Sequence, residues 1–171
     1  NKETQVVFND DYTSNSNIEA CSVTVNGNSV VTFLSGDNLI VRGKIDVAAT
    51  AQLKINDNAN IYQIEEIANT GNILLDKTVT IKRLNYVFWS SPVANQNLKN
   101  FSPETLNQRF YEFNPAGGTT ETAYINIDPL THNFLPAKGY TIRAENNWTT
   151  TPTDWTGSFN GTPFNGRINK A

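Results

Sequence analysis

Methionine is absent from this sequence of 171 residues, and cysteine and histidine occur once each. Because Cys21 has no second cysteine to pair with, no disulfide can form within the chain. We expect the Cys21 side chain to be buried and to pack as a small apolar group. With His132 as the only histidine, the chain lacks the set of nitrogen and sulfur ligands that a zinc site requires. We therefore expect no metal and no cofactor.

Calcium is the one cation for which the sequence leaves a mild alternative. Several aspartates lie in or near turns, where carboxylate and carbonyl oxygens could gather. These residues are Asp10, Asp11, Asp37, Asp57 and Asp76. Their spacing matches no calcium-binding loop, and aspartate in a turn usually accepts hydrogen bonds from its own backbone.

The residues needed for catalysis are equally sparse. A serine or cysteine nucleophile would have to use His132 as its base, yet this residue lies in a turn-like loop and no nucleophile elbow is present. Gly117 and Gly118 lack the lysine and helix of a phosphate-binding loop. Glu65 and Glu66, adjacent on a strand, would face opposite ways and could not act as a pair. We expect no catalytic residues and no enzyme activity.

The chain also lacks basic clusters and long apolar runs. The net charge is −3 and no segment concentrates lysine or arginine, so we expect neither nucleic acid nor direct membrane insertion. Only 17% of the residues are charged, whereas asparagine, threonine and glycine are abundant. This composition is typical of extracellular β proteins and predicts an extracellular or outer-surface location.

Valine, leucine and isoleucine recur every eight residues from Val23 onward. The positions are Val23, Val31, Leu39, Val47 and Ile55, with a second series of Ile45, Leu53 and Ile61. Apolar and polar residues alternate within each unit, which is the pattern of strands with one buried face, and turn-forming residues separate the units. Such units can stack as a solenoid or pair as an antiparallel meander. We predict the solenoid, with the whole first series buried on its inward face.

From Leu84 onward the repeat stops, aromatic residues become frequent, and five irregular strands are indicated. We therefore divide the chain into a linker or initial irregular strand at residues 1–18, solenoid repeats at 19–83, and a β-sandwich at 84–171. The predicted fold is all-β, a short β-solenoid followed by a jelly-roll-like β-sandwich. Whether Ala171 interrupts this second unit is left open.

Several short segments carry a resemblance to a known group of proteins. They lie at residues 19–25, 69–73, 86–93, 102–105, 138–143 and 159–166, and Trp89-Ser90-Ser91-Pro92-Val93 is the most specific. Together they resemble large secreted proteins of Flavobacterium-like Bacteroidota, many of which are type IX secretion substrates anchored at the cell surface. The resemblance implies an adhesin or a gliding-associated protein. Its implied partners are other domains of the same long chain, surface glycans, or the secretion and anchoring machinery.

The aromatic residues could form a platform on which sugar rings stack. They are Trp89, Trp148 and Trp155 together with Tyr62, Tyr86, Tyr111, Tyr124 and Tyr140. Trp148 and Trp155 flank a threonine- and proline-rich loop and are the tryptophans expected to be exposed, whereas Trp89 lies within an apolar strand. Since an exposed indole offers a broad rigid face, we predict that any ligand binds at Trp148 and Trp155. We expect a non-catalytic structural or adhesive module of a secreted surface protein. The alternative is a carbohydrate-binding accessory module of a secreted hydrolase.

Overall fold

A computed structural model describes residues 3–169, which divide into two compact units. Within the described residues, unit 1 comprises 3–77 and 158–169, and unit 2 comprises 78–157. We predicted a boundary after residue 83 and assigned everything beyond it to the second unit. In the structure the chain leaves unit 1 earlier, and its last segment belongs to unit 1 again.

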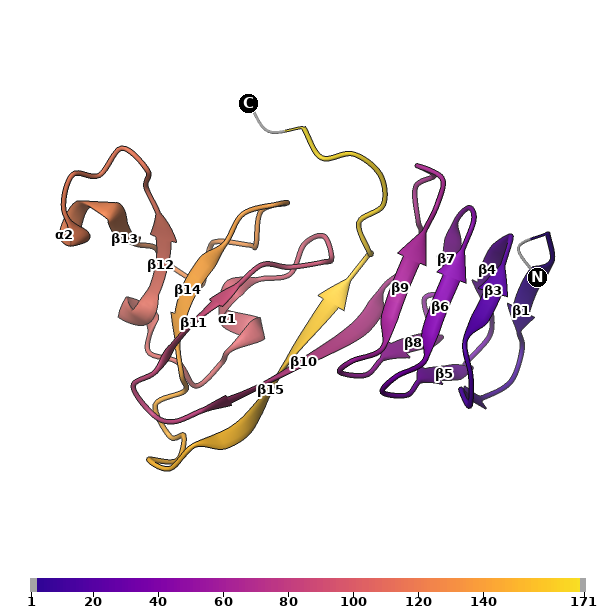
Figure 1. Ribbon diagram of the computed structural model, residues 1–171, viewed down its shortest axis with the longest axis horizontal. Coiled ribbons are helices and arrows are strands. Elements are labelled where there is room, and N and C mark those ends of the chain that lie inside the picture. The colour runs from indigo at the N-terminus through magenta and orange to yellow at the C-terminus, as the bar shows by residue number, and fades with distance from the viewer. Residues whose placement is uncertain (1–2, 170–171) are drawn as a thin grey trace. The chain divides into compact units, whose positions relative to one another are not determined.

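Unit 1 is a solenoid built from three parallel sheets (Figure 1). Its strands are β1 (Gln5–Phe8), β2 (Tyr12–Thr13), β3 (Ile18–Ala20), β4 (Ser22–Val25), β5 (Val30–Phe33), β6 (Asn38–Val41), β7 (Ile45–Val47), β8 (Gln52–Ile55) and β9 (Asn60–Gln63). The sheets are β1-β4-β7, β3-β6-β9 and β2-β5-β8, and the last continues through β10 (Ile73–Ile81) and β15 (Thr153–Gly161). The parallel pairing confirms the solenoid and excludes the meander.

The central coils return to the same place after 22 residues, since Val23 pairs with Ile45 and Val31 with Leu53. The first coil is shorter, with Gln5 opposite Ser22. The eight-residue interval is the length of two sides, from Val23 to Val31 and on to Leu39, and the third side, from Leu39 to Ile45, takes six residues. Residues 3–18 supply β1, β2 and the start of β3, so the initial segment forms a coil of its own.

The predicted inward positions are buried as expected. Val23, Val31 and Leu39 have no exposed surface, and Val47 and Ile55 are also buried. They come from the three sides of the coil and point to its centre, where Val23, Val31 and Leu39 stack on the residues that pair with them in the next coil. Burial of these aliphatic side chains, at roughly 25 cal/mol per Å² of apolar surface, is the main contribution that stabilises the solenoid.

A ladder of asparagines runs along one corner of the solenoid. The Asn38 side-chain amide donates to Asn17 Oδ1 at 3.1 Å, and that of Asn60 donates to Asn38 Oδ1 at 3.0 Å. Asn17 Oδ1 also accepts from the Asn38 backbone N–H at 2.8 Å. Stacked amides of this kind satisfy each other's hydrogen bonds and fix the register of successive coils.

The returning C-terminal segment hydrogen-bonds to the last coil. Asn165 Nδ2 donates to the carbonyls of Glu65 and Ile67 at 2.8 and 2.7 Å. Asn69 Nδ2 donates to the Pro163 carbonyl at 3.0 Å. These bonds satisfy backbone acceptors that no further coil pairs with, which explains why this segment belongs to unit 1.

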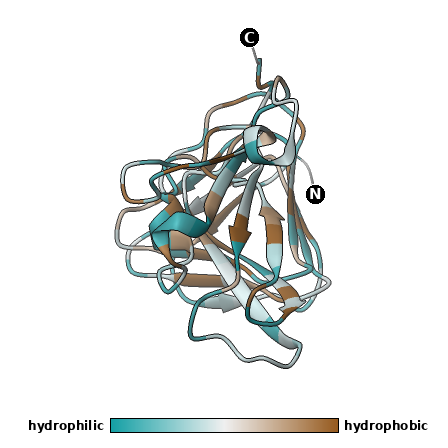
Figure 2. Ribbon diagram, turned by 90° about the vertical axis from the view of Figure 1, so that its left-hand side faces the viewer, coloured by the Kyte–Doolittle hydropathy of each residue, from teal (hydrophilic) through white to brown (hydrophobic). Residues whose placement is uncertain are grey.

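Unit 2 contains a four-stranded antiparallel sheet in the order β11-β14-β12-β13. Its elements are β11 (Tyr86–Trp89), α1 (Leu98–Phe101), a 3-10 turn (Asn107–Arg109), β12 (Phe110–Phe113), α2 (Thr120–Ala123), β13 (Tyr124–Asn126) and β14 (Tyr140–Arg143). Hydrophobic and polar segments alternate along the strands (Figure 2). The remaining parts of β10 and β15 run as a ribbon in which Thr78 Oγ1 lies 2.9 Å from Thr156 Oγ1. Unit 2 shares antiparallel strands with the predicted jelly roll, but it does not have the eight strands in two sheets that define that fold.

An aromatic cluster forms the core of unit 2. The Phe101 ring lies 5.1 Å from Trp89, 5.3 Å from Phe134 and 5.6 Å from Trp155, each edge to face. Edge-to-face contacts add about 0.5–1.5 kcal/mol per pair beyond the burial of area. The short helix α1 brings Phe101 to the centre of this cluster, and Asn97 caps the helix by accepting from Lys99 N and Asn100 N.

We predict that Leu39→Ala lowers the free energy of unfolding by about 2–5 kcal/mol, because a fully buried side chain is replaced by a cavity. Chemical denaturation followed by circular dichroism measures the change. Ile40→Ala is the matched control, since Ile40 is half-buried on the outward face of the same strand and should cost less. Equal losses for the two variants would contradict the inward stacking.

Candidate ligand-binding face

Two faces of the antiparallel sheet in unit 2 differ in exposure because successive residues of a strand point to opposite sides. Trp89, Phe110 and Ile142 point inward and are buried. Their chain neighbours point outward, where the register aligns Phe88 with Thr141 and Thr141 with Tyr111. The sheet therefore buries one aromatic set and presents another.

We name the outward set the aromatic face. It consists of Tyr86 and Phe88 of β11, Tyr111 and Phe113 of β12, and Tyr124 of β13. Phe88 is 69% exposed and Phe113 54% exposed. Phe113 and Tyr124 also contact each other, with ring centroids 5.5 Å apart. Large apolar rings gathered on one exposed surface usually mark a binding site.

The two tyrosines at one end of this face meet across the central strand. Tyr86 and Tyr111 belong to the strands on either side of β14, and their ring centroids lie 6.0 Å apart at 64°. Beneath them, the outward side chains of β14 are Thr141 and Arg143, and both are buried. The tyrosine pair thus covers the outward side chains of β14 and borders the exposed part of the aromatic face.

Two open hollows of about 450 Å³ each lie on the aromatic face. The first is lined by Tyr86, Phe88, Tyr111, Thr120, Glu121, Tyr124 and Thr141, and the second by Phe88, Phe113, Tyr124, Ala137, Lys138, Gly139 and Thr141. Because they share Phe88, Tyr124 and Thr141, we treat them as one aromatic groove. Hollows of this volume, mostly apolar with few polar groups, are typical of small-molecule sites.

The polar groups of the aromatic groove are few and lie at its rim. The backbone N–H of Glu121 and the Thr119 side chain hold the pKa of the Glu121 carboxyl below its ordinary value, so the carboxylate is charged at neutral pH. Lys138 forms an ion pair with Glu112. These groups can orient a polar ligand through hydrogen bonds while the rings provide contact area.

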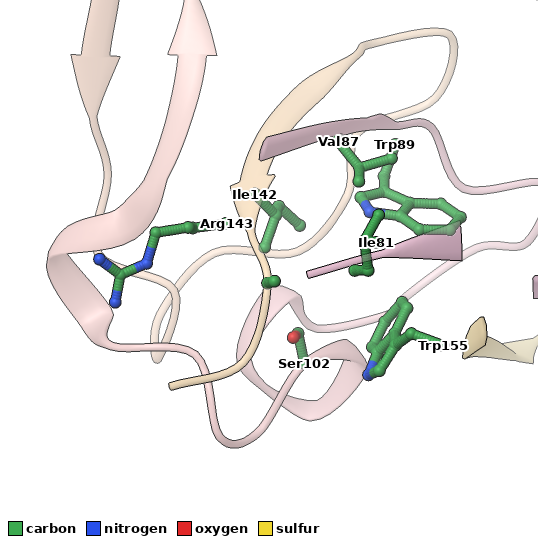
Figure 3. A pocket seen from close by; sticks show the side chains of 8 residues that line it. Ile81, Val87, Trp89, Ser102, Ile142, Arg143 and Trp155 are labelled. Carbon is green, nitrogen blue, oxygen red and sulfur yellow. The ribbon is translucent and has the colours of Figure 1, made fainter. Parts of the chain in front are cut away.

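The expectation that Trp155 is exposed is wrong. This side chain is 8% exposed and its ring lies 5.6 Å from Trp89, edge to face. Its Nε1 donates to Glu145 Oε2 at 3.2 Å. Figure 3 shows the two indoles beside Ile81 and Ile142 around a void of about 10 Å³, which has room for about one water at most. The strand alternation of β15 explains the error, since Trp155, Gly157 and Phe159 all point inward.

Trp148 is half-buried. Its Nε1 donates to the Ile81 carbonyl at 3.2 Å, so the N–H of the indole already has a hydrogen-bond acceptor within unit 2. The structure therefore offers one partly accessible indole where we expected two, and ligand binding at Trp148 stays a prediction. The sequence indicated Tyr86, Tyr111 and Tyr124 as possible members of a platform for sugar rings, but it gave Phe88 and Phe113 only as strand residues and placed the site at the tryptophans. The alternation Tyr86-Val87-Phe88-Trp89 is the signal that could have found Phe88.

The other sequence candidates have local roles in the structure. Cys21, expected to be buried, is half-buried. His132 is exposed, with Nδ1 2.7 Å from the Asp128 carbonyl. Asp37 accepts from Ser14 Oγ at 2.5 Å and Asp11 accepts from Val30 N at 2.8 Å, so both bond to another coil of the solenoid instead of to their own backbone as expected. Within residues 3–169, no group of three or more histidine, cysteine, aspartate or glutamate side chains is placed to hold a metal ion.

Fold and site together define an all-β protein with a solenoid unit and an exposed aromatic groove on an antiparallel sheet. No helix among residues 3–169 has the length and apolar character that crossing a bilayer requires. The chain belongs to the family described as Domain of unknown function (DUF8693), whose model matches residues 2–171. Comparison with curated proteins and with solved structures gives no match.

We predict that Trp155→Ala lowers the free energy of unfolding by about 3–5 kcal/mol, because it removes a large side chain from the aromatic core. Trp148→Ala serves as the control and should cost less, since its indole is only half-buried. Denaturant titrations followed by far-ultraviolet circular dichroism measure both. A Trp155→Ala variant as stable as the parent would contradict the core assignment.

Proposed function

We propose that the protein is a non-catalytic attachment module of a secreted bacterial surface protein, and that it attaches by binding glycans in the aromatic groove. The observation that carries this proposal is the aromatic face itself. Phe88 and Phe113 remain more than half exposed although the core of unit 2 is well filled with rings. Keeping such side chains in water is unfavourable unless a ligand covers them.

Sugar rings are suitable occupants of a surface of this kind. One side of a pyranose presents C–H groups, which lie well against the negative face of an aromatic ring. The hydroxyls at the rim of the sugar need hydrogen-bond partners, which Thr120, Glu121 and Lys138 can provide. A flat, rigid aromatic side chain also loses little conformational entropy when it binds.

The two joined hollows favour a chain of sugars over a single one. They share Phe88, Tyr124 and Thr141, and each has a volume of about 450 Å³, so one sugar ring can lie on each side of the shared residues. An oligosaccharide segment fits this arrangement. The same groove would serve an accessory module of a secreted hydrolase, and the domains elsewhere in the parent protein distinguish the two uses.

We predict that the parent protein binds a subset of glycans on an array, and that Phe88→Ala weakens this binding about tenfold, which corresponds to about 1.4 kcal/mol. Loss of the most exposed ring removes contact area from both hollows. Isothermal titration calorimetry with the best oligosaccharide from the array measures the dissociation constant.

Tyr62→Ala is the matched control for this experiment. Tyr62 is an aromatic residue of similar exposure, 62%, but it lies on β9 of the solenoid. Its replacement should leave the affinity unchanged. If no glycan binds, or if Phe88→Ala and Tyr62→Ala behave alike, the aromatic groove is not the attachment site.

A further inference from the structure

Two arginines lie at the tyrosine end of the aromatic face. The register of the sheet places Arg143 of β14 opposite Tyr86 of β11. On the other side of β14, Phe110 pairs with Ile142, the residue before Arg143. Arg109 is the last residue of the 3-10 turn and directly precedes Phe110, so both arginines adjoin this pair.

Neither guanidinium has an acidic partner. None of the ion pairs formed among residues 3–169 includes Arg109 or Arg143. The Nε–H groups of both are buried and have no hydrogen-bond acceptor within the described residues. Arg143 is only 7% exposed, and its Nη2 donates to Asn146 Oδ1 at 3.2 Å. Among the described residues, the buried Arg143 charge thus has one hydrogen-bond acceptor, the side-chain amide of Asn146, which is neutral.

The burial of Arg143 is unfavourable by itself. Buried arginines are normally paired with a carboxylate or another anion, because an uncompensated charge in a low-dielectric environment is costly. An anion bound from outside would relieve this cost.

Two tyrosine side chains lie beside Arg109, and the hydroxyl of one of them, Tyr111, donates to the Gln108 carbonyl at 3.0 Å. Hydrogen bonding by the Tyr111 side chain, and secondly the charge interaction and hydrogen bond with Tyr86, raise the pKa of Arg109, which places both phenols beside this guanidinium. Arg109 is half-buried and can be reached from solvent. Tyr86 and Tyr111 line the first hollow of the groove, so the arginine pair lies next to the ligand surface.

We propose that Arg109 and Arg143 recognise the carboxylate of an acidic sugar whose ring lies in the aromatic groove, an inference that rests on glycan binding there. Arg109 donates to the carboxylate directly. Arg143 lies behind it and contributes its charge through the low-dielectric interior, where electrostatic attraction is less screened than in water.

One further charge lies in the first hollow. Glu121 lines this hollow together with Tyr86 and Tyr111 and is held in its charged form. Its repulsion disfavours an acidic group next to Glu121, so the carboxylate of a bound sugar gains most at the arginines.

A matched pair of probes tests this proposal on the full chain. The probes are trigalacturonic acid and its fully methyl-esterified form, which share a ring skeleton and differ in charge. We expect the acid to bind about tenfold more tightly than the ester at low ionic strength, since hydrogen bonds to a charged acceptor are roughly twice as strong as neutral ones. In Arg109→Gln this preference should disappear, while binding of the ester is retained.

Three further variants make the result specific. Arg109→Lys should keep part of the preference, because it retains the charge but loses the planar fork. Phe88→Ala should weaken both probes equally and leave their ratio unchanged. Arg167→Gln removes one exposed arginine from unit 1 and should change neither affinity nor ratio. Circular dichroism checks that each variant folds.

The outcomes separate the two proposals. If acid and ester bind equally, or if Arg109→Gln keeps the preference for the acid, the arginine site is refuted while glycan binding stands. If sodium acetate competes as strongly per carboxylate as the trisaccharide, the arginines form a general anion site and the sugar-acid inference is refuted. If neither probe binds and no array glycan does, the groove is not a glycan site and both proposals fail.

Discussion

Alternation of side chains along a β-strand is the constraint on which this structure depends. In β11, β14 and β12 of unit 2, every residue that enters the core forces its neighbour outward. Trp89, Phe110 and Ile142 fill the core, so Phe88, Tyr111 and Thr141 must lie on the other face. Since the neighbours of the core residues are also large aromatics, an exposed aromatic surface follows directly from a buried one.

The central strand of the sheet is covered on both faces. All four residues of β14 are buried, although two of them, Thr141 and Arg143, point away from the core. The cover comes from Tyr86 and Tyr111, which reach across β14 from either side. This arrangement lowers the dielectric constant around the Arg143 charge and makes the tyrosine end of the groove the place where an anion gains most.

The sequence was sufficient to predict the solenoid because its signal is local and repeated. Each strand carries its own alternation and each turn its own asparagine or glycine, so period and burial could be inferred together. The length of the coil was not available in this way. The eight-residue interval gives the length of two of the three sides, and only the parallel pairing of Val23 with Ile45 shows that a turn closes after 22 residues.

The site was less predictable because it depends on contacts between distant residues. The strand Tyr86-Val87-Phe88-Trp89 was recognised, but which of its two faces enters the core is decided by Phe101, Phe134 and Trp155, far along the chain. For the same reason the exposure of Trp155 was misjudged. A tryptophan beside a polar loop looks accessible until its strand parity is known, and β15 places it on the inward side.

Polarity along the groove has a consequence for how a polymer would lie in it. Aromatic rings alone bind a sugar chain in either direction, because their faces carry no directional hydrogen bonds. Because Glu121 lines the first hollow and Lys138 the second, the two directions differ in electrostatic energy for any chain whose acidic residue is not central. Contact area would then set the affinity, while the unequal charges along the groove would set the direction and the choice of sugar.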